Sequence, residues 1–488
     1  QGNPDGFMPM KIDFKSALLN DLKSFKWDEN RRPRKTPFRK SQTTVGPRLF
    51  DRSRSVKELV TEFDALHAEK ERERRASMVY KGRTTDSNEV KMSLSATQDD
   101  VEAIISNAIT TLDLISKGLK SIPEKIFRLR MLEHLHMEDN DLVFIPEDIS
   151  KLNNLKELAL SSNNIITFPN TVGKLKQLQS LSLARNRIVE IPSEIGDMKT
   201  LENLWLQTNI LATLPKEIGK LACLKILDLA ENNLVILPDE VGGLESLERL
   251  SLEKNKLHTL PNTIGKLRHL IYLSVERNKL SDIPGDVGML ESLEILNLAK
   301  NELSFLPEEI EKLSDLEELY LHCNLLKNIP PGIAKLNDLL VLSLYENSLG
   351  NVNFDFSSMY SLETLQLQNN RITTVSPSLG NLKALQHLNL SWNRLTELPV
   401  GVPELENLQN LQLVGNGLID LPDMSSLKVL EKLRLEYNRL REYPTGIDHI
   451  NEVELTGNQI LEEMVPDVDG ENKQKKNQEQ LPNLDKQK

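Results

Sequence analysis

The sequence predicts a curved α/β solenoid of stacked repeats, with a parallel sheet on the concave face and short irregular or helical segments on the convex face. Three observations predict it. Asparagine recurs thirteen times at an unbroken spacing of 23, from Asn140 to Asn416. Leucine or a close relative precedes nearly every one by eight, five and three residues, and proline follows most of them by six. A fixed period of this length is typical of units that bury a core only by stacking.

Each element of the repeat has a physical reason. The alternating apolar residues before the asparagine predict a short strand with one buried face. The asparagine amide is expected to bond backbone groups left unpaired by a tight turn, and stacking should repeat that bond as a ladder. Proline lacks an N–H, so it is expected to end the strand layer before the convex segment returns.

The two ends of the array read as caps. The stretch "TTLDLISKGLKSIP" (110–123) is a degenerate first repeat with Lys117 in the asparagine position. Residues 98–108 precede it and predict a cap helix with an acidic first turn. At the other end the spacing shortens, to Asn438 and then Asn458. We expect about 16 repeats over 109–460, with an inner face roughly 70 Å long at about 4.8 Å per strand.

One pair of repeats, over residues 347–377, departs from the pattern. Asn353 and Ser376 take the proline position, and Pro377 is displaced by one residue. The missing proline predicts a different local backbone geometry on the convex side of these two repeats. Two interpretations stay open: drift in a tolerant convex segment, or a binding loop or hinge.

The repeat reads LxxLxLxxNxLxxLPxxIxxL, the leucine-rich repeat signature, as in "LKILDLAENNLVILPDEVGGL" at 224–244. It resembles the intracellular 23-residue class found in Ras–Raf scaffolds, Ras suppressor proteins, scribble-type polarity proteins and plant Ras-group-related proteins. The resemblance covers roughly 70% of the chain. It implies a non-enzymatic scaffold that binds a small GTPase, a phosphatase or a cytoskeletal partner on its concave face, without a cofactor.

The positions six, four, two and one before each asparagine are not needed for the core. Trp205 is in this set and must face outward if Leu204 and Leu206 are buried. Six of the ten Trp and Tyr residues of the chain occupy these positions. Aromatic side chains are enriched where proteins bind partners. The predicted protein-binding residues on the concave face are Trp205, Asp228, Arg249, Tyr272, Glu276, Tyr320, His322, Tyr345, Trp392, Arg434 and Tyr437. The alternative is an ordinary solvated sheet face.

Charge and cysteine content narrow the class of protein. Residues 1–100 hold 21 Lys and Arg against 16 Asp and Glu, whereas the remainder holds 39 against 56. The acidic remainder argues against general nucleic-acid binding. Only two cysteines, Cys223 and Cys323, favour a reducing, cytoplasmic location. No apolar run is long enough for a transmembrane helix. The sequence begins at Gln1 rather than Met, as a fragment would, and it leaves the oligomeric state open.

The sequence predicts no catalytic centre, no metal site and no small-molecule substrate. It has no phosphate-binding loop, nucleophile elbow or H-E-x-x-H motif. Cys323 directly follows His322, but adjacent residues of a strand point to opposite faces. The two are therefore not expected to pair as a catalytic nucleophile and base. The one metal-like constellation is His134, His136 and Glu138 on one predicted strand face, with Glu157 on the neighbouring strand. Zinc usually takes four ligands, so a structural role is favoured there.

The N-terminal extension, 1–97, lacks the repeat and is predicted to be mostly disordered. Amphipathic helices are predicted near 12–27 and 55–75, either packed on the solenoid or folding on a partner. Between them, residues 31–54 hold nine basic residues and one acidic residue. This stretch is either a solvated linker or a contact to an anionic surface. The tail 461–488 is polar and also predicted to be disordered.

Two short motifs lie in the extension. "KIDF", with Lys11, Ile12 and Phe14, fits the pattern by which regulatory subunits dock protein phosphatase type 1, although a helix competes for the same residues. "RRAS" resembles a site for basic-directed kinases and makes Ser77 a candidate for phosphorylation.

The predicted function is therefore an interaction scaffold in signal transduction that regulates a small GTPase or a phosphatase. A structural cytoskeletal or ciliary protein that uses its basic N-terminal arm is the first alternative. An immune-type or ubiquitin-ligase adaptor is the second.

Overall fold

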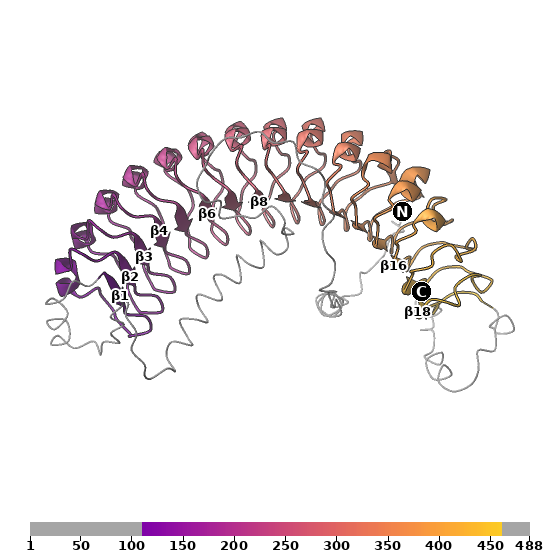
Figure 1. The fold of residues 1–488 in the computed structure, drawn as a ribbon, viewed down its shortest axis with the longest axis horizontal. Helices are drawn as coiled ribbons and strands as arrows, with labels where there is room; N and C mark the ends of the chain where they lie inside the picture. Colours follow the sequence, from indigo (N-terminus) through magenta and orange to yellow (C-terminus); the bar gives the residue numbers. More distant parts are fainter. Residues whose placement is uncertain (1–109, 461–488) are drawn as a thin grey trace, which may run out of the picture. The chain divides into compact units, whose positions relative to one another are not determined.

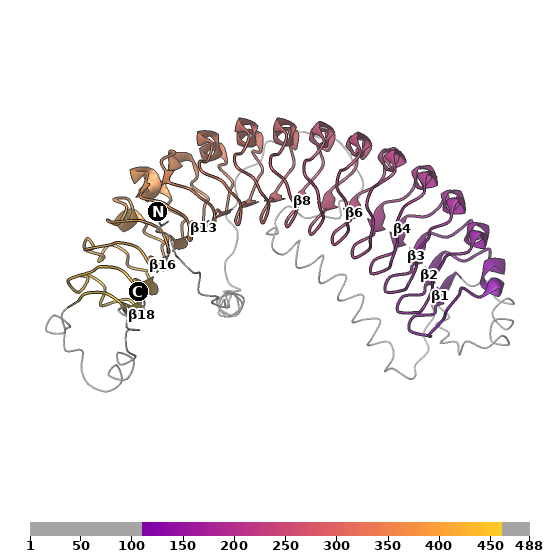
Figure 2. The same cartoon turned by 180° about the vertical axis from the view of Figure 1, so that it is seen from behind.

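The computed structural model describes residues 110–460. These residues form an uninterrupted stack of repeats that is curved into an arc (Figure 1). Sixteen strands form one parallel sheet in chain order on the concave side, and short 3-10 helices line the convex side. The same arrangement is seen from behind in Figure 2. The prediction of a leucine-rich repeat solenoid of about 16 repeats is confirmed. The predicted cap helix at 98–108, the N-terminal extension and the tail 461–488 lie outside the described residues.

The strands of the main sheet are β1 Thr111–Asp113, β2 His134–His136, β3 Glu157–Ala159, β4 Ser180–Ser182, β5 Asn203–Trp205, β6 Ile226–Asp228, β7 Arg249–Ser251, β8 Tyr272–Ser274, β9 Ile295–Asn297, β10 Glu318–Tyr320, β11 Val341–Ser343, β13 Thr364–Gln366, β15 His387–Asn389, β16 Asn410–Gln412, β17 Lys432–Arg434 and β18 Glu452–Glu454. A second sheet pairs β12 Asn351–Val352 with β14 Thr374–Val375. The helices are η1 Glu124–Arg128, η2 Glu147–Lys151, η3 Asn170–Lys174, η4 Ser193–Asp197, η5 Lys216–Lys220, η6 Asp239–Gly243, η7 Asn262–Lys266, η8 Gly285–Met289, η9 Glu308–Lys312, η10 Pro331–Lys335, η11 Phe356–Ser358, η12 Pro377–Asn381 and η13 Val402–Glu404.

Every strand of the main sheet except the last buries its central residue and turns its two neighbours to the concave side, whereas the central Val453 of β18 is only half-buried. In β5, Leu204 is fully buried, whereas Asn203 and Trp205 on either side are only half-buried. The strands pair in register over one repeat, so Trp205 lies beside Asp228 of β6. Residues in the same repeat position therefore form columns across the concave face.

The asparagine ladder forms as predicted. The Asn232 amide donates to the carbonyls of Leu229 (3.0 Å) in its own repeat and Leu206 (2.9 Å) in the preceding one. Its oxygen accepts from the N–H of Leu211 at 3.0 Å. Each buried asparagine thus satisfies backbone groups of two repeats at once, and so it links one repeat to the next.

The residue before each ladder asparagine adopts a left-handed conformation. Thirteen such positions within residues 110–460 carry a side chain, and Ser116, which precedes Lys117 of the degenerate first repeat, is a fourteenth left-handed residue; φ lies between 53° and 58° at all of them. Left-handed backbone costs roughly 1–2 kcal/mol for a residue with a Cβ. The left-handed turn lets the following asparagine reach backbone groups of both repeats. The hydrogen bonds that this asparagine makes in turn stabilise the left-handed conformation.

Proline begins the convex segment as well as ending the strand layer. Pro238 stands at the N-cap of η6, and its carbonyl accepts from the N–H of Val241 at 3.0 Å. A Cβ on Gly242 in η6 would lie 2.6 Å from the carbonyl oxygen of Thr263 in η7. Glycine at this position therefore lets neighbouring helices stack closely on the outer side.

The irregular repeats change the outer layer, as the sequence predicts. The second sheet, β12 with β14, forms between the asparagine turns and the convex helices. Helix η11 is only three residues long, and the Asp355 side chain caps it by accepting from the N–H of Ser357. Asp355 thus replaces the usual proline start. Whether this segment acts as a binding loop stays open as a hypothesis.

Candidate functional site

The eleven predicted concave residues occupy two kinds of position. Trp205, Asp228, Arg249, Tyr272, Tyr320 and Arg434 lie in strands of the main sheet, half-buried. The other five lie beyond the strands, in the turns that lead to the asparagine: Glu276, His322, Tyr345, Trp392 and Tyr437. The sequence argument assigned all of them to the concave face by their distance from the asparagine, and it did not separate strand from turn; each strand is only three residues long, so this second group lies in the turns. The columns of equivalent residues across the concave face nevertheless continue beyond the strands, because the turns, with their left-handed residues, repeat in the same register.

A cation–π pair lies at the middle of the sheet. The Arg249 guanidinium is 3.7 Å from the centre of the Tyr272 ring in the next strand. The Tyr272 hydroxyl donates to Glu253 at 3.0 Å. Burial and the Glu253 carboxylate raise the pKa of Tyr272 well above its usual range. The three side chains hold each other in one arrangement, so this part of the face is fixed before any partner arrives.

Glu276 is the centre of an ionic group beside that pair. Its carboxylate lies 2.6 Å from Lys300 Nζ and 3.4 Å from Arg277 Nε, and it accepts from Asn297 at 3.3 Å. Burial alone would raise the pKa of Glu276, but the Lys300 hydrogen bond and charge outweigh burial and hold the pKa below its ordinary value. The carboxylate is consequently ionised and already neutralised by neighbouring cations.

Three aromatic side chains meet over β10 and β11. The His322 and Tyr345 rings stack with centroids 4.3 Å apart, and Tyr320 packs edge-on to His322 at 6.3 Å. The Tyr320 hydroxyl donates to Glu318 at 2.7 Å. Burial, followed by the charge of Lys300, lowers the pKa of His322 to about 4. His322 is therefore neutral at physiological pH, and the three rings form a rigid, mostly apolar patch that we call the aromatic cluster (Tyr320, His322 and Tyr345).

An acidic edge beside the aromatic cluster was missed by the sequence argument. Glu317 lies one position before β10, seven residues before its asparagine, a column that the argument left out. Burial, followed by the charges of the Glu294, Glu318 and Asp338 carboxylates, raises the pKa of Glu317 to about 7. The signal was visible in the sequence, because glutamate recurs at this position at 248, 294, 317 and 363.

The C-terminal aromatics form a separate exposed pair. The Trp392 and Tyr437 rings stack at 6.2 Å and are 46% and 60% exposed. They come from turns two repeats apart, and Gly415 occupies the same turn position between them. A Cβ on Gly415 would lie 2.7 Å from Trp392 Cδ2. Glycine there leaves room for the Trp392 ring to lean across the intervening repeat.

Arg434 lies near this pair in β17. Its guanidinium bonds Glu436 at 3.1 Å and Glu452 of β18 at 2.8 Å. Burial would lower the pKa of Arg434, but these two carboxylates hold it above its ordinary value. Arg434 therefore joins the last strands of the sheet in addition to facing the concave side.

The histidine constellation in β2 is organised around one carboxylate. Glu157 Oε2 of β3 lies 3.3 Å from His134 Nδ1 and 3.5 Å from His136 Nε2. Glu138 falls beyond the end of β2, so the prediction that it shares the strand with the histidines is wrong. No group of three metal-ligating side chains suited to an ion occurs among residues 110–460.

The argument that set aside a His322–Cys323 catalytic pair also needs correction. Both residues lie in the turn after β10, and Cys323 has a φ of 56°, so strand alternation does not apply. The thiol instead donates to Glu346 at 3.2 Å. Burial and this carboxylate raise the pKa of Cys323 to about 12, so the reactive thiolate is not formed at neutral pH.

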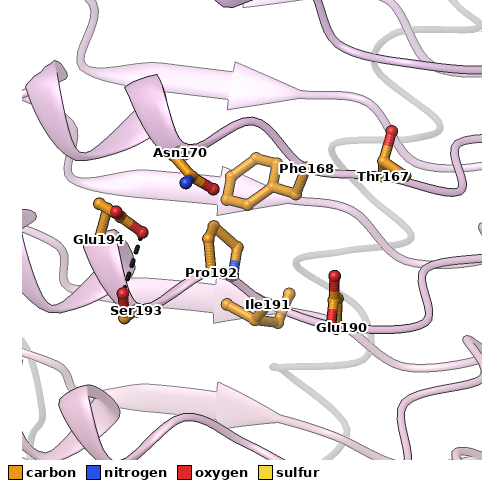
Figure 3. Close-up of a pocket in the computed structure, with 8 residues that line it drawn as sticks. All are labelled: Thr167, Phe168, Asn170, Glu190, Ile191, Pro192, Ser193 and Glu194. Atoms are coloured by element: carbon orange, nitrogen blue, oxygen red, sulfur yellow. Dashed lines mark hydrogen bonds between the residues drawn. The ribbon is translucent and has the colours of Figure 1, made fainter.

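A small hollow of about 280 Å³ lies away from the concave columns (Figure 3). It is found between successive repeats where the chain climbs from the sheet to η3 and η4. In Figure 3 the Phe168 ring lies beside Pro192, and Ser193 donates to Glu194 at 3.0 Å. Its lining residues are Thr167, Phe168, Asn170, Glu190, Ile191, Pro192, Ser193 and Glu194. The open, largely polar lining lacks the convergent groups of a small-molecule site.

The family comparison agrees with the geometry. The leucine rich repeat model matches residues 107–165 and overlapping segments that span 199–395, and a single-repeat model matches 177–198. The chain belongs to the leucine-rich repeat family. These matches indicate no catalytic family. No curated protein matches the chain in a sequence comparison.

Solved structures extend the likeness over most of the array. A leucine-rich repeat protein of Leptospira interrogans is 33% identical, with a TM-score of 0.62 over 74% of this chain and 94% of its own. The plant peptide hormone receptor RGFR1, solved in complex with RGF2, is 30% identical, with a TM-score of 0.58 over 72% of this chain and 63% of its own. The Drosophila Toll–Spatzle complex is 22% identical with a TM-score of 0.61, over 70% of this chain and 51% of the other, and shows the fold alone. Within residues 110–460, no helix is long and apolar enough to cross a bilayer.

Proposed function

We propose that the repeat domain is a non-enzymatic protein-binding scaffold whose concave face holds a protein partner. The aromatic cluster is the observation that carries this proposal. Its rings are large, partly exposed and held in place by each other and by Glu318, so binding would cost little side-chain entropy. Leucine-rich repeat proteins bind protein partners, and a plant relative was solved with one bound.

The partner we favour is a component of intracellular signalling, a Ras-like small GTPase or protein phosphatase type 1, encountered in the cytoplasm. The 23-residue repeat supports the GTPase, and "KIDF" at 11–14 supports the phosphatase. The two candidate partners would require different parts of the chain. A GTPase would bind the concave face in one nucleotide state, whereas the phosphatase would need Ile12 and Phe14 of the N-terminal extension.

The test is an affinity purification with the full chain as bait. The concave variant carries Trp205→Ala, Tyr320→Ala and Tyr345→Ala, and the arm variant carries Ile12→Ala and Phe14→Ala. Tyr360→Ala is a matched control, because Tyr360 is 59% exposed and belongs to none of the concave columns. We expect the concave variant to lose the main partner while the control keeps it.

Two further results complete the test. If only the arm variant loses the partner, the repeats act as a spacer and the concave proposal is wrong. Purified GTPase loaded with GDP or with a non-hydrolysable GTP analogue then separates the signalling hypotheses. Equal binding of both nucleotide states, together with unchanged binding of the phosphatase to the arm variant, would exclude both named partners.

A further inference from the structure

Seven residues before the asparagine, two early repeats pair an acidic side chain with a lysine. Glu133 lies 2.7 Å from Lys156, and Glu202 lies 2.8 Å from Lys225. In both pairs the lysine occupies the same position of the following repeat, 23 residues further on. This column of the concave face therefore neutralises its own carboxylates where the sequence provides a lysine.

Glu317 occupies the same position without such a lysine. The following repeat has Leu340 there, and the N–H of Leu340 donates to the carbonyl of Glu317 at 2.8 Å, so the two residues are direct neighbours. Within residues 110–460 the Glu317 carboxylate enters no ion pair. The charged groups that raise its pKa, after burial, are three further carboxylates. We keep the name acidic edge for the four residues Glu294, Glu317, Glu318 and Asp338.

The fold itself does not require a carboxylate at Glu317. Its pKa of about 7 lies above the ordinary value of 4.5, so ionising Glu317 disfavours the folded state as the pH rises through this range. A glutamine of similar shape would avoid that cost, and Gln179, Gln386 and Gln409 hold the same position in other repeats of the same register. A charge that costs stability and serves no internal contact is typical of a surface that meets a ligand.

Apolar and aromatic side chains adjoin the acidic edge. Glu318 of β10 pairs in register with Val341 of β11, which is half-buried. The Glu318 carboxylate accepts from the Tyr320 hydroxyl at 2.7 Å, which joins the acidic edge to the aromatic cluster. Two neighbouring strands thus present negative charge, aliphatic surface and aromatic rings together. Lysine and arginine side chains complement this combination, because they carry an apolar stem and a cationic head that aromatic rings also attract.

We propose that the middle of the concave face binds a basic segment of the protein partner. A lysine or arginine side chain of that segment packs its stem on Leu340 and Val341 and brings its cationic head to Glu317 and Glu318, beside the aromatic cluster. This inference rests on the proposed function, because it names the chemistry of the partner at the same face. Charge complementarity selects this partner, since an acidic or neutral segment would cover the Glu317 charge without compensating it.

The test selects short random peptides, displayed on phage, for binding to the immobilised full chain. We expect the recovered peptides to be enriched in lysine and arginine over the unselected library. The peptide recovered most often is then synthesised, and its affinity is measured by fluorescence anisotropy. The acid variant, Glu317→Gln with Glu318→Gln, should weaken its binding at least about tenfold. Glutamine keeps the shape of both side chains and removes repulsion, so this variant should melt no earlier than the natural chain.

A matched control separates a site from the general attraction of basic peptides to a chain of net charge −12. Glu308→Gln with Glu309→Gln makes the same change in charge on η9, on the convex side of the repeat that leads into β10. Neither carboxylate enters an ion pair within residues 110–460. We expect this control to change the affinity of the peptide by less than about twofold.

A third variant keeps the inference and the proposed function distinguishable. It carries Tyr320→Ala and Tyr345→Ala and removes two rings of the aromatic cluster. Peptides that need these rings but are not basic, or that bind the acid variant as well as the natural chain, overturn the inference and leave the proposed function standing. A selection that recovers no basic peptides above the unselected library overturns it as well. Basic peptides that need Glu317 and Glu318 but not the rings contradict the role given to the aromatic cluster instead.

Discussion

The His322 imidazole stacks on the Tyr345 ring, with the two planes 9° apart and the centroids separated by 4.3 Å. The stack bridges neighbouring repeats, since each ring comes from the turn after its own strand. Ser343 Oγ lies 3.2 Å from His322 Nδ1 and donates to Gln366 at 2.9 Å, which extends the network into a third repeat. The middle of the concave face is therefore ordered by side chains as well as by the sheet.

The stability of the solenoid should depend on pH through His322. Its folded pKa of about 4 lies below its ordinary value of 6.5, so the unfolded chain binds a proton first as the pH falls. Stability is then fully present above pH 6.5 and lost progressively between pH 6.5 and 4. We expect His322→Gln to remove part of this dependence, on the order of 1–3 kcal/mol. Urea unfolding from pH 7.5 to 4.5 measures it, and equal slopes in both proteins would contradict it.

Removing one rung of the asparagine ladder should be costly. Asn232→Ala leaves the N–H of Leu211 without its side-chain partner. It also removes one of the two asparagine amides that donate to each of the carbonyls of Leu206 and Leu229, which keep Asn209 and Asn255 respectively. A buried backbone group left unpaired costs about 1–3 kcal/mol, so we expect a loss of about 2 kcal/mol. Asn233→Ala is the neighbouring control and should change the free energy of unfolding by less than about 0.5 kcal/mol. Denaturant unfolding compares them, and similar losses in both would rule out the ladder as a main contributor.

Adjacent residues of β5 should respond very differently to truncation. Leu204 is fully buried, so Leu204→Ala should cost about 2–5 kcal/mol through the cavity that it leaves. Trp205 faces the concave side and is half-buried, so Trp205→Ala should cost about 1 kcal/mol or less. Thermal melting of the two variants tests the difference. A Trp205 variant as unstable as the Leu204 variant would show that the indole belongs to the core.

Gly415 should be needed for the Trp392 ring to keep its position. An alanine Cβ would meet the ring and would also strain a backbone with φ of 67°. We expect Gly415→Ala to destabilise the domain by about 1–2 kcal/mol and to shift the Trp392 fluorescence. The double variant with Trp392→Ala relieves the clash and leaves only the backbone strain. If the double and single variants lose equal stability, the ring contact has no part in the effect.

The repeat period predicted most of the fold because each position has one physical task. The apolar positions, the asparagine and the proline each place a local element, and thirteen copies in one register leave little freedom in how the elements stack. The details of the site were harder to predict. The strands end after three residues, so Glu276, His322, Tyr345, Trp392 and Tyr437 lie in left-handed turns rather than on a strand face.

The contacts across repeats could not be predicted from the period either. Whether Arg249 covers Tyr272, or Lys300 reaches Glu276, depends on side-chain directions between strands 23 residues apart. The acidic edge at Glu317 was missed for a different reason, since only the columns inside the expected strand and turn were considered. Its elevated pKa arises from partial burial and, after that, from three neighbouring carboxylates, which only the folded arrangement brings together.

The ladder of Asn232 and its equivalents also sets how the array would respond to force. Each asparagine joins its own repeat to the one before, so a chain pulled from one end would release repeats one at a time. Every release frees about 23 residues, or roughly 80 Å of extended chain. Under tension the molecule would therefore lengthen in steps of about one repeat, slightly shorter where the asparagine spacing falls at Asn438 and Asn458.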